Sequence, residues 1–550
     1  MRRALLLAVA ILVVAPATAT AHATLEASTP ERGAKLDAVP SQVVLRFDEP
    51  VEASFGALRV FDQQGREVQA GKPFRPGGDS KQVAVKLSPG TKPGGFTATY
   101  RVVSADSHPV SGGFVFTVGD AAAPARTVDE LLQGSNSGPV TSTAFAVVRA
   151  IQYGAIAIGL GALIFLLFAW GKAAPGNAAF SAGLRRLLLL VAVAGLLSAV
   201  AGVVLQGATA GGTSAWAALD PDVLDAVLST RFGGVWGVGV FAWLAVLIGA
   251  VAVAPGPALL PPLLALALLP ALGGHAGVQP PVWLNAPANV LHVLAVSAWV
   301  GGIAVLVFVL RGATRGLEPA QRAKTLAAVV GRFSTLALGA IALLLATGIT
   351  QAIIGMSSLS ELLDTAYGRA VLVKLGLLLA IIGLGAVNRT RVLPRLRDAA
   401  SPGAAGVLLR RTLNTELAIA LVVLGATGAL AGYPPANTVA AGPYSTDARI
   451  GPARLELTVE PAAVGSNELH VYLFNRADGR QYDATKELTV TAELPGKQIH
   501  PIALDAREAG PGHYVVSGAA FGVKGDWEVE VVARVSDFDE YRTTVKVPIR

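Results

Sequence analysis

The stretch from Asn289 to Leu310, NVLHVLAVSAWVGGIAVLVFVL, is strongly apolar and carries a single ionisable residue, His292. A helix needs about 20 apolar residues to cross the hydrocarbon core of a bilayer, and this stretch has that length. An ionisable side chain in such a helix is costly to bury and marks a candidate functional site. We therefore expect a membrane span with a functional imidazole near one end.

The composition limits the class of protein. The 550-residue chain is 53% hydrophobic, which excludes an ordinary soluble protein. Its net charge of +7 comes largely from short loops between apolar stretches, which indicates membrane topology rather than nucleic-acid binding. Cysteine is absent, and the two methionines are Met1 and Met356. Any metal would therefore be held by His, Asp, Glu, Met or backbone nitrogen.

Residues 1–21 have the parts of a secretory signal peptide. Arg2 and Arg3 precede an apolar run, which ends in the small-residue motif Ala19-Thr20-Ala21. Cleavage after Ala21 would make His22 the mature N-terminus. There the α-amine and the ring nitrogen of His22 can chelate one metal ion.

The remaining sequence predicts a multidomain membrane protein with an all-α block between two β-domains. Residues 22–119 alternate in the manner of a β-sandwich or barrel, and residues 451–550 in the manner of an immunoglobulin-like β-sandwich. Residues 120–143 and 434–450 have the composition of linkers. The block 144–433 is expected to hold eight spans: 144–170, 184–207, 232–254, 257–273, 289–310, 329–355, 367–388 and 411–432.

Basic residues favour one orientation of these spans. If the first β-domain is outside, the loops after spans 1, 3, 5 and 7 are cytoplasmic, and these loops hold most of the Lys and Arg. The signal peptide predicts the same topology. Both β-domains are then extracytoplasmic and the block lies in the cytoplasmic membrane.

The membrane block also looks internally repeated. LSTRFGGVWGVGVFAWL at 228–244 resembles LDTAYGRAVLVKLGLLL at 363–379, and the span around Gln152 resembles the span around His292. Four spans per half would make the halves parallel repeats. Shared apolar composition is the alternative explanation.

One pattern in the first β-domain suits a metal. Asp106 and His108 are two positions apart, so on an extended segment their side chains point the same way. Together with the two nitrogens of His22 they form an N,O donor set of the kind that suits Cu(II). The spacing alone also fits a hydrated turn with unrelated histidines.

The first β-domain resembles the periplasmic copper-binding family CopC. The resemblance rests on HATLEASTPERGAKLDAVPSQVVLRFDEPVE, which begins at His22, and on YRVVSADSHPVSGGFVFTVG, which ends at Gly119. It implies that His22, Asp106 and His108 bind Cu(II). The Met-rich Cu(I) site of some members has no counterpart here, because this domain has no methionine after cleavage.

The membrane block resembles CopD, the inner-membrane partner of that family. The resemblance rests on GGHAG at 273–277, NVLHVLAVSAWVGGI at 289–303 and two later stretches, at 365–389 and 415–435. His275, His292 and Met356 are then expected near the outer ends of their spans, where imidazole and thioether suit copper, especially Cu(I). Each also has a structural interpretation. His275 could be a solvated loop residue, His292 could hydrogen-bond a neighbouring carbonyl, and Met356 could fill a gap between helices. Lys374 and Glu416 are interpreted as structural: Lys374 could snorkel outward or pair with an acid, and Glu416 could pair with Arg410 or Arg411.

The C-terminal β-domain resembles YtkA/FixH-like extracytoplasmic domains through GPGHY at 510–514 and GDWEVEV at 525–531. His470, His500 and His513 are its candidate copper residues, although histidines on strands are more often structural.

These observations predict a fused copper protein without enzymatic activity. The N-terminal domain would capture Cu(II) and pass it to the eight-helix domain for import. Its partners would be the copper ion, the bilayer and an extracytoplasmic copper chaperone or reductase. The alternatives are copper sequestration, resistance or sensing without transport, a haem-binding membrane cytochrome that uses His275 and His292, and an oxidase built on His22. The sequence has no P-loop that would couple transport to ATP.

Overall fold

The computed structural model describes residues 23, 25–53, 57–105, 109–119, 128, 131, 137–171, 177–253, 255–356, 359–397, 402–431, 444–460, 462–477 and 480–549. The chain divides into two compact units. One contains residues 146–202 and 235–438, and the other contains residues 22–145, 203–234 and 439–550. The signal-peptide, His22, Asp106 and His108 predictions lie outside the described residues.

The N-terminal β-domain is a two-sheet sandwich, as the alternating pattern predicted. Its sheets have the strand orders β1-β3-β6-β5 and β2-β8-β7-β4. Val43, Leu45 and Phe47 alternate into the core from β3, where they meet Phe96 and Phe114 from the other sheet. The strands are β1 (Leu25–Thr29), β2 (Lys35–Leu36), β3 (Gln42–Phe47), β4 (Leu58–Phe61), β5 (Gln69–Phe74), β6 (Gln82–Leu87), β7 (Gly95–Val103) and β8 (Pro109–Val118).

The C-terminal β-domain is a second sandwich, with sheet orders β14-β15-β11-β10-β9 and β13-β12-β16-β17. Its core joins both sheets through residues such as Leu455, Val471 and Val529, with Trp527 fully buried among them. The strands are β9 (Tyr444–Ile450), β10 (Ala453–Glu460), β11 (Gly465–Asn475), β12 (Glu487–Leu494), β13 (Ile499–Leu504), β14 (Ala506–Gly510), β15 (His513–Phe521), β16 (Gly525–Arg534) and β17 (Glu540–Ile549).

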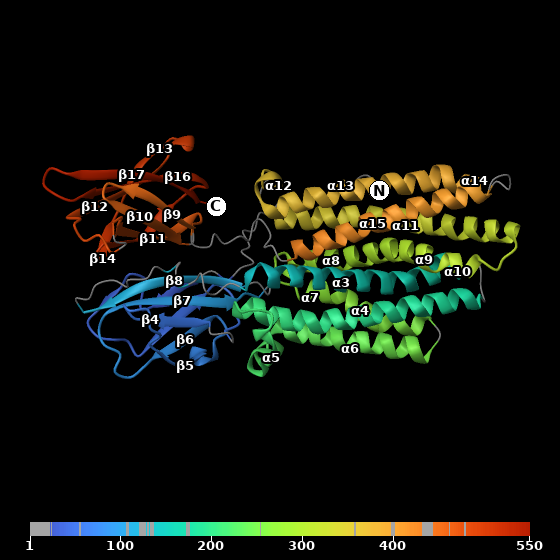
Figure 1. The fold of residues 1–550 in the computed structure, drawn as a ribbon, viewed down its shortest axis with the longest axis horizontal. Coiled ribbons are helices and arrows are strands. Elements are labelled where there is room, and N and C mark those ends of the chain that lie inside the picture. Colours follow the sequence, from blue (N-terminus) through green and yellow to red (C-terminus); the bar gives the residue numbers. More distant parts are fainter. Residues whose placement is uncertain are drawn as a thin grey trace. The chain divides into compact units, whose positions relative to one another are not determined.

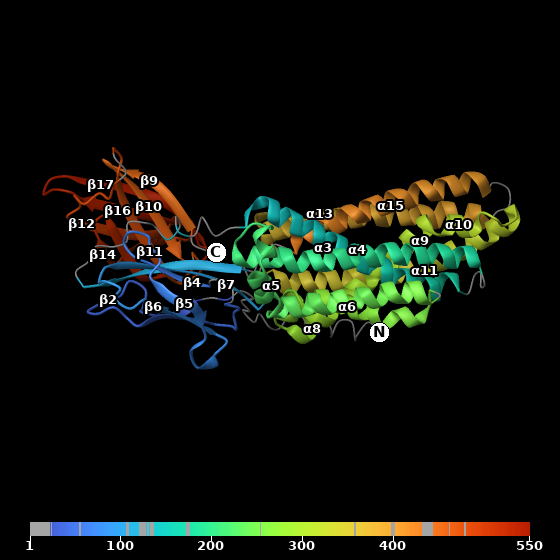
Figure 2. The ribbon, with the colours of Figure 1, turned by 60° about the horizontal axis from the view of Figure 1, so that its bottom comes forward.

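The middle of the chain is helical, and its long helices lie side by side along one direction (Figure 1, Figure 2). Three π-helical segments, η2, η6 and η7, interrupt or end them. The helical elements are α3 (Gly138–Phe165), η2 (Leu166–Trp170), α4 (Ala178–Gly211), α5 (Pro221–Leu228), α6 (Arg231–Ala252), η4 (Pro257–Leu259), α7 (Leu260–Leu272), η5 (His275–Gly277), α8 (Val282–Val296), η6 (Ser297–Gly301), α9 (Gly302–Phe308), α10 (Leu310–Thr314), α11 (Pro319–Gly355), α12 (Glu361–Asp364), α13 (Ala366–Val387), η7 (Asn388–Val392), α14 (Leu393–Arg397) and α15 (Pro402–Leu430).

Seven helices in the described part of the chain are long and apolar enough to cross a membrane. They correspond to seven of the eight expected spans. The fourth expected span, 257–273, coincides with a shorter apolar helix over Pro257–Leu272. At 1.5 Å per residue this helix is about 24 Å long, less than the ~30 Å hydrocarbon core. The described helices therefore comprise seven long candidate spans and one short apolar helix, which lies where the sequence places a short, proline-flanked fourth span.

The predicted repeat has a structural counterpart at the start of α6 and α13, which are both 22 residues long. Thr230 Oγ1 accepts a hydrogen bond from the Gly233 amide (3.1 Å), and Thr365 Oγ1 accepts one from the Gly368 amide (2.9 Å). A Cβ at either glycine would collide with the backbone of the short helix before it. These pairs fall at matching positions of the two similar stretches.

A second sign of the repeat is a close crossing of α3 with the helix that contains η6. A Cβ at Gly161 would collide with the Ser297 carbonyl, and a Cβ at Gly301 would collide with the Ala157 carbonyl. The alignment that pairs Gln152 with His292 also pairs Gly161 with Gly301 and Ala157 with Ser297. The contact is therefore reciprocal, as it is where two equivalent elements meet at a two-fold axis.

Candidate metal sites

The expected N-terminal copper ligands adjoin well-anchored described residues. Ala23, next to His22, is buried in the sandwich core. Val103 and Pro109 are paired as the end of the β7–β8 ladder, so residues 106–108 connect these two strands. The sequence predictions for His22, Asp106 and His108 remain predictions, because these residues lie outside the described ones.

A carboxylate that the sequence analysis did not single out lies at the base of this connection. Glu49 Oε1 accepts a hydrogen bond from the Ala105 amide (3.2 Å) and a short one from the Ser104 hydroxyl. Glu52 pairs with Val103 in an isolated bridge beside it. These contacts fix the backbone that leads into residues 106–108.

In the membrane block His292 lies on α8 and faces α11. Its Nδ1 is 3.0 Å from the Thr347 hydroxyl. One turn away, Asn289 Nδ2 donates to Gln351 Oε1 (3.0 Å). Two polar contacts thus join α8 to α11 in an otherwise apolar setting. In the sequence, these contacts could have been anticipated from the isolated Asn, Gln and Thr residues within otherwise apolar helices.

His275 and Met356 lie at the ends of neighbouring segments. His275 begins the short helix η5, and its carbonyl accepts a hydrogen bond from the Gln279 amide (2.8 Å). The Gln279 side chain donates to the Ile354 carbonyl (3.1 Å) in the last turn of α11. Met356 caps the C-terminal end of this helix, two residues further on. Gln279 therefore ties the His275 turn to the end of α11. The described residues include no group of three or more His, Asp or Glu side chains that could hold a metal.

Lys374 and Glu416 differ in their surroundings. Lys374 is partly buried on the apolar helix α13. Glu416 on α15 is 3% exposed, and its Oε1 accepts a hydrogen bond from Asn388 Nδ2 (2.6 Å). The expected pairing of Glu416 with Arg410 or Arg411 is therefore wrong, because the amide of Asn388 takes that place.

The C-terminal domain brings two of its three histidines together. His470 on β11 and His513 on β15 are fully buried, and His470 Nδ1 lies 3.2 Å from His513 Nε2. His470 Nε2 is 2.9 Å from Glu468 Oε1, without the alignment of a hydrogen bond. The Tyr472 ring stacks on the His513 ring, with centroids 4.1 Å apart. His500 stands apart, exposed on β13.

A buried carboxyl group lies on the strand next to this histidine pair. Glu460 on β10 is directly opposite Glu468. It accepts hydrogen bonds from Tyr100 Oη (3.0 Å) and from the Gly113 amide (3.3 Å), which belong to the same compact unit. Burial raises the pKa of Glu460, and the neighbouring Glu468 raises it further.

Burial also affects the titration of His513. It holds the pKa of His513 well below its usual value, and the neighbouring His470 lowers that pKa further. A neutral His513 can share a hydrogen bond with His470 without placing two positive charges side by side. The close contact of these two buried rings joins β11 to β15 inside the sandwich.

Three family models match the chain. The CopC domain matches residues 25–119, the Copper resistance protein D-like N-terminal domain matches residues 140–282, and Copper resistance protein D matches residues 327–430. The matches follow the borders of the N-terminal sandwich and of the helical block. The C-terminal sandwich lies beyond these three ranges, so its YtkA/FixH-like character remains a prediction.

One curated relative matches nearly the whole chain, and others match single parts of it. The chain is 29% identical over 546 residues to the Copper transport protein CutJ of Bacillus subtilis (strain 168), with 96% of each chain covered. It is 26% identical over 258 residues to Copper resistance protein D of Pseudomonas syringae pv. tomato, covering 44% of this chain and 81% of the relative. It is 33% identical over 118 residues to Protein YobA of Escherichia coli (strain K12), covering 21% of this chain and 95% of the relative.

Proposed function

We propose that this chain, in which a CopC domain and a CopD membrane domain are joined in one polypeptide, captures copper outside the cytoplasmic membrane and imports it. The observation that carries the proposal is the presence of both domains in one chain. A binding domain fused to a membrane domain keeps the captured ion at a high local concentration beside the membrane.

The N-terminal domain is the proposed site of capture. His22, Asp106 and His108 would hold Cu(II) through the terminal amine, two imidazoles and one carboxylate. The buried Ala23 and the end of the β7–β8 ladder support this set, because they hold the two segments that carry these residues. Copper is the cargo here and not a permanent part of an enzyme. The related proteins are named for copper transport or resistance.

The membrane path is proposed to begin at His275 and Met356 and to continue to His292. The Gln279 bridge joins the first two segments, and the α8–α11 contacts lead from there to His292. Imidazole and thioether favour Cu(I), so reduction before entry fits this path. Among the described residues, no three His, Asp or Glu side chains are grouped so that they could hold a metal ion. The proposed path therefore consists of brief contacts between a moving ion and single ligands, not of a storage site.

Capture is tested on the full-length protein in detergent. Cu(II) is titrated into the mature form and into a form with one extra alanine ahead of His22. Binding is monitored by the EPR spectrum of the bound Cu(II). We expect tight type-2 binding in the mature form and its loss in the extended form. Equal, weak binding in both forms would contradict the proposed site.

Import is tested with the same protein in sealed vesicles loaded with a copper chelator. We expect copper to accumulate with the unmodified chain and to fall at least about tenfold with His292→Gln, since removal of a metal contact or its support costs 10–100-fold. His500→Gln, an exposed histidine, is the matched control. If vesicles without the protein accumulate as much copper as vesicles with it, copper sequestration is favoured over import. A Soret band in the purified protein would favour a haem-binding cytochrome.

A further inference from the structure

Glu416 is the one acidic residue within the seven candidate spans that the structure describes. Its helix runs from Ala404 to Leu430, and Glu416 lies five residues after Arg411, in the first part of the expected span 411–432. Its side chain is 3% exposed within the bundle. A carboxyl group buried in an apolar helical bundle is expensive, and residues of this kind in membrane proteins commonly serve ion or proton movement.

The partners of Glu416 are neutral. Asn388 Nδ2 donates to Glu416 Oε1 (2.6 Å), and Asn388 Oδ1 in turn accepts from Thr412 Oγ1 (2.5 Å). The Leu409 carbonyl on the same helix lies 2.9 Å from Thr412 Oγ1 and is an alternative acceptor for its one hydrogen. All three side chains of this Glu416–Asn388–Thr412 group are buried.

Several helical elements near this group carry charged side chains, but none of these pairs with it in the described structure. Arg389, one residue beyond Asn388, is exposed and donates to Ser334 Oγ (3.0 Å). Lys374 is on α13, about 20 Å along the helix axis from Asn388. The other charged residues on the packed elements η7, α14 and α15 are Arg391, Arg395, Arg397, Arg410 and Arg411.

The chemistry of an amide partner suits a carboxyl group that gains and loses a proton. The NH₂ end of Asn388 donates to an ionised carboxylate, and its C=O end accepts from a neutral carboxylic acid. The Thr412 hydroxyl can rotate to satisfy the end that is left. A lysine or arginine partner would instead hold the carboxylate in its charged form only. The group can therefore stay hydrogen-bonded in both protonation states.

The local backbone gives a second, independent sign. The π-helical segment η7 begins at Asn388, directly after α13. Such segments are rare, and inside helices they occur frequently at functional sites. Here the π turn coincides with the residue that reaches across to Glu416. An ordinary structural hydrogen bond between helices does not need this change of helix type.

We propose that Glu416 is a proton-binding site and that one proton on its carboxyl group is taken up from one side of the membrane and released to the other in each transport cycle. No bond other than O–H forms or breaks, and nothing is oxidised or reduced. This inference rests on the proposed copper transport and supplies its energy source, since the sequence has no P-loop. Asn388 and Thr412 act as positioning residues.

The test uses the full-length protein in proteoliposomes with a pH-sensitive dye inside and a copper gradient across the membrane. We expect copper movement to be accompanied by a pH change in the lumen. In Glu416→Gln the pH change should fall at least tenfold, and copper movement should stop responding to an imposed pH gradient. Glu416→Asp should keep part of both effects.

Controls separate this inference from the copper proposal. Glutamine can keep the Asn388 contact, so a thermal unfolding curve checks that Glu416→Gln is folded. Thr415→Val alters an exposed position of the same helix and should leave both signals unchanged. Copper movement without any pH change, or an undiminished pH change in Glu416→Gln, overturns the proton site and leaves copper transport standing. An unmodified chain that moves no copper overturns the proposed function itself.

Discussion

At the scale of single residues, burial decides which groups influence stability. His513 illustrates this, since its folded pKa is lowered well below 6.5. The unfolded chain therefore binds a proton on this residue in a pH range where the folded chain does not. By linkage, the stability that the neutral His513 contributes is present above about pH 6.5 and is lost as the pH falls below it.

The His513→Gln variant tests this directly. Between pH 7.5 and 5.5 the unmodified C-terminal sandwich should lose up to ~1.4 kcal/mol of stability per pH unit through this residue, and the variant should lose less. Hydrogen exchange of β11 and β15 peptides in the full-length protein measures the change. His500→Gln is the exposed control. An identical pH dependence in His513→Gln and the unmodified chain would refute the assignment.

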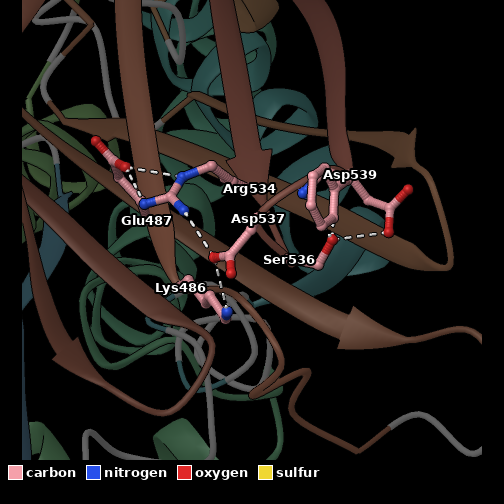
Figure 3. Close-up of polar contacts among 7 residues, drawn as sticks. Lys486, Glu487, Arg534, Ser536, Asp537 and Asp539 are labelled. Carbon is pink, nitrogen blue, oxygen red and sulfur yellow. Dashed lines mark hydrogen bonds and ion pairs between the residues drawn. The ribbon is translucent and has the colours of Figure 1, made fainter.

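Exposed charges should contribute much less than the buried histidines. Figure 3 shows Arg534 bound to Glu487, with Nε and one Nη at 3.0 and 2.6 Å from the same carboxylate oxygen, while Asp537 bridges Arg534 and Lys486. All four side chains are at least 40% exposed. We expect Arg534→Ala to cost less than about 1 kcal/mol in a chemical unfolding experiment. A cost above ~2 kcal/mol would show that the network acts as more than a set of surface pairs.

At the scale of elements, glycines fix how closely helices approach. Gly161→Ala should destabilise the bundle by about 1–3 kcal/mol, because its new methyl group would collide with the Ser297 carbonyl where α3 crosses η6. Gly383→Ala on α13 is the matched control, since a Cβ there meets nothing within 4 Å. Thermal unfolding in detergent compares the two. Equal melting temperatures would mean that the crossing is not tightly packed.

At the scale of the whole molecule, the two halves of the membrane block share a framework and differ in their polar groups. The first half buries Gln152, whose Oε1 accepts from Ser198 Oγ (2.7 Å) and Trp243 Nε1 (3.2 Å). The second half has His292 and Thr347 in the corresponding contact between helices. His292, Lys374 and Glu416 all belong to the second half. We infer that the proposed copper path runs mainly through this half, while the first half contributes His275 at its entrance and is otherwise a structural counterpart.

Paired substitutions separate these roles. Thr347→Val removes the hydrogen bond that orients the His292 ring, so copper uptake in vesicles should fall by about tenfold or more. Ser198→Ala removes the matching contact in the first half and should cost about 1 kcal/mol of stability with uptake unchanged. Uptake that falls equally in both variants would argue against the division of roles.

The sequence by itself determined the membrane class, the two flanking β-domains and the resemblance to CopC and CopD. These properties follow from apolar run length, from alternation along strands and from local motifs, which depend on neighbouring residues only. His292 was also identifiable, because an ionisable residue stands out in an apolar helix.

Only the tertiary structure decided which buried groups meet. It paired Glu416 with Asn388 in place of an arginine, His292 with Thr347, and His470 with His513. It also showed the fourth expected span as a short helix. The physical reason is the same in each case. A buried polar group takes the partner that packing brings within about 3 Å, and packing joins segments that are distant in the sequence.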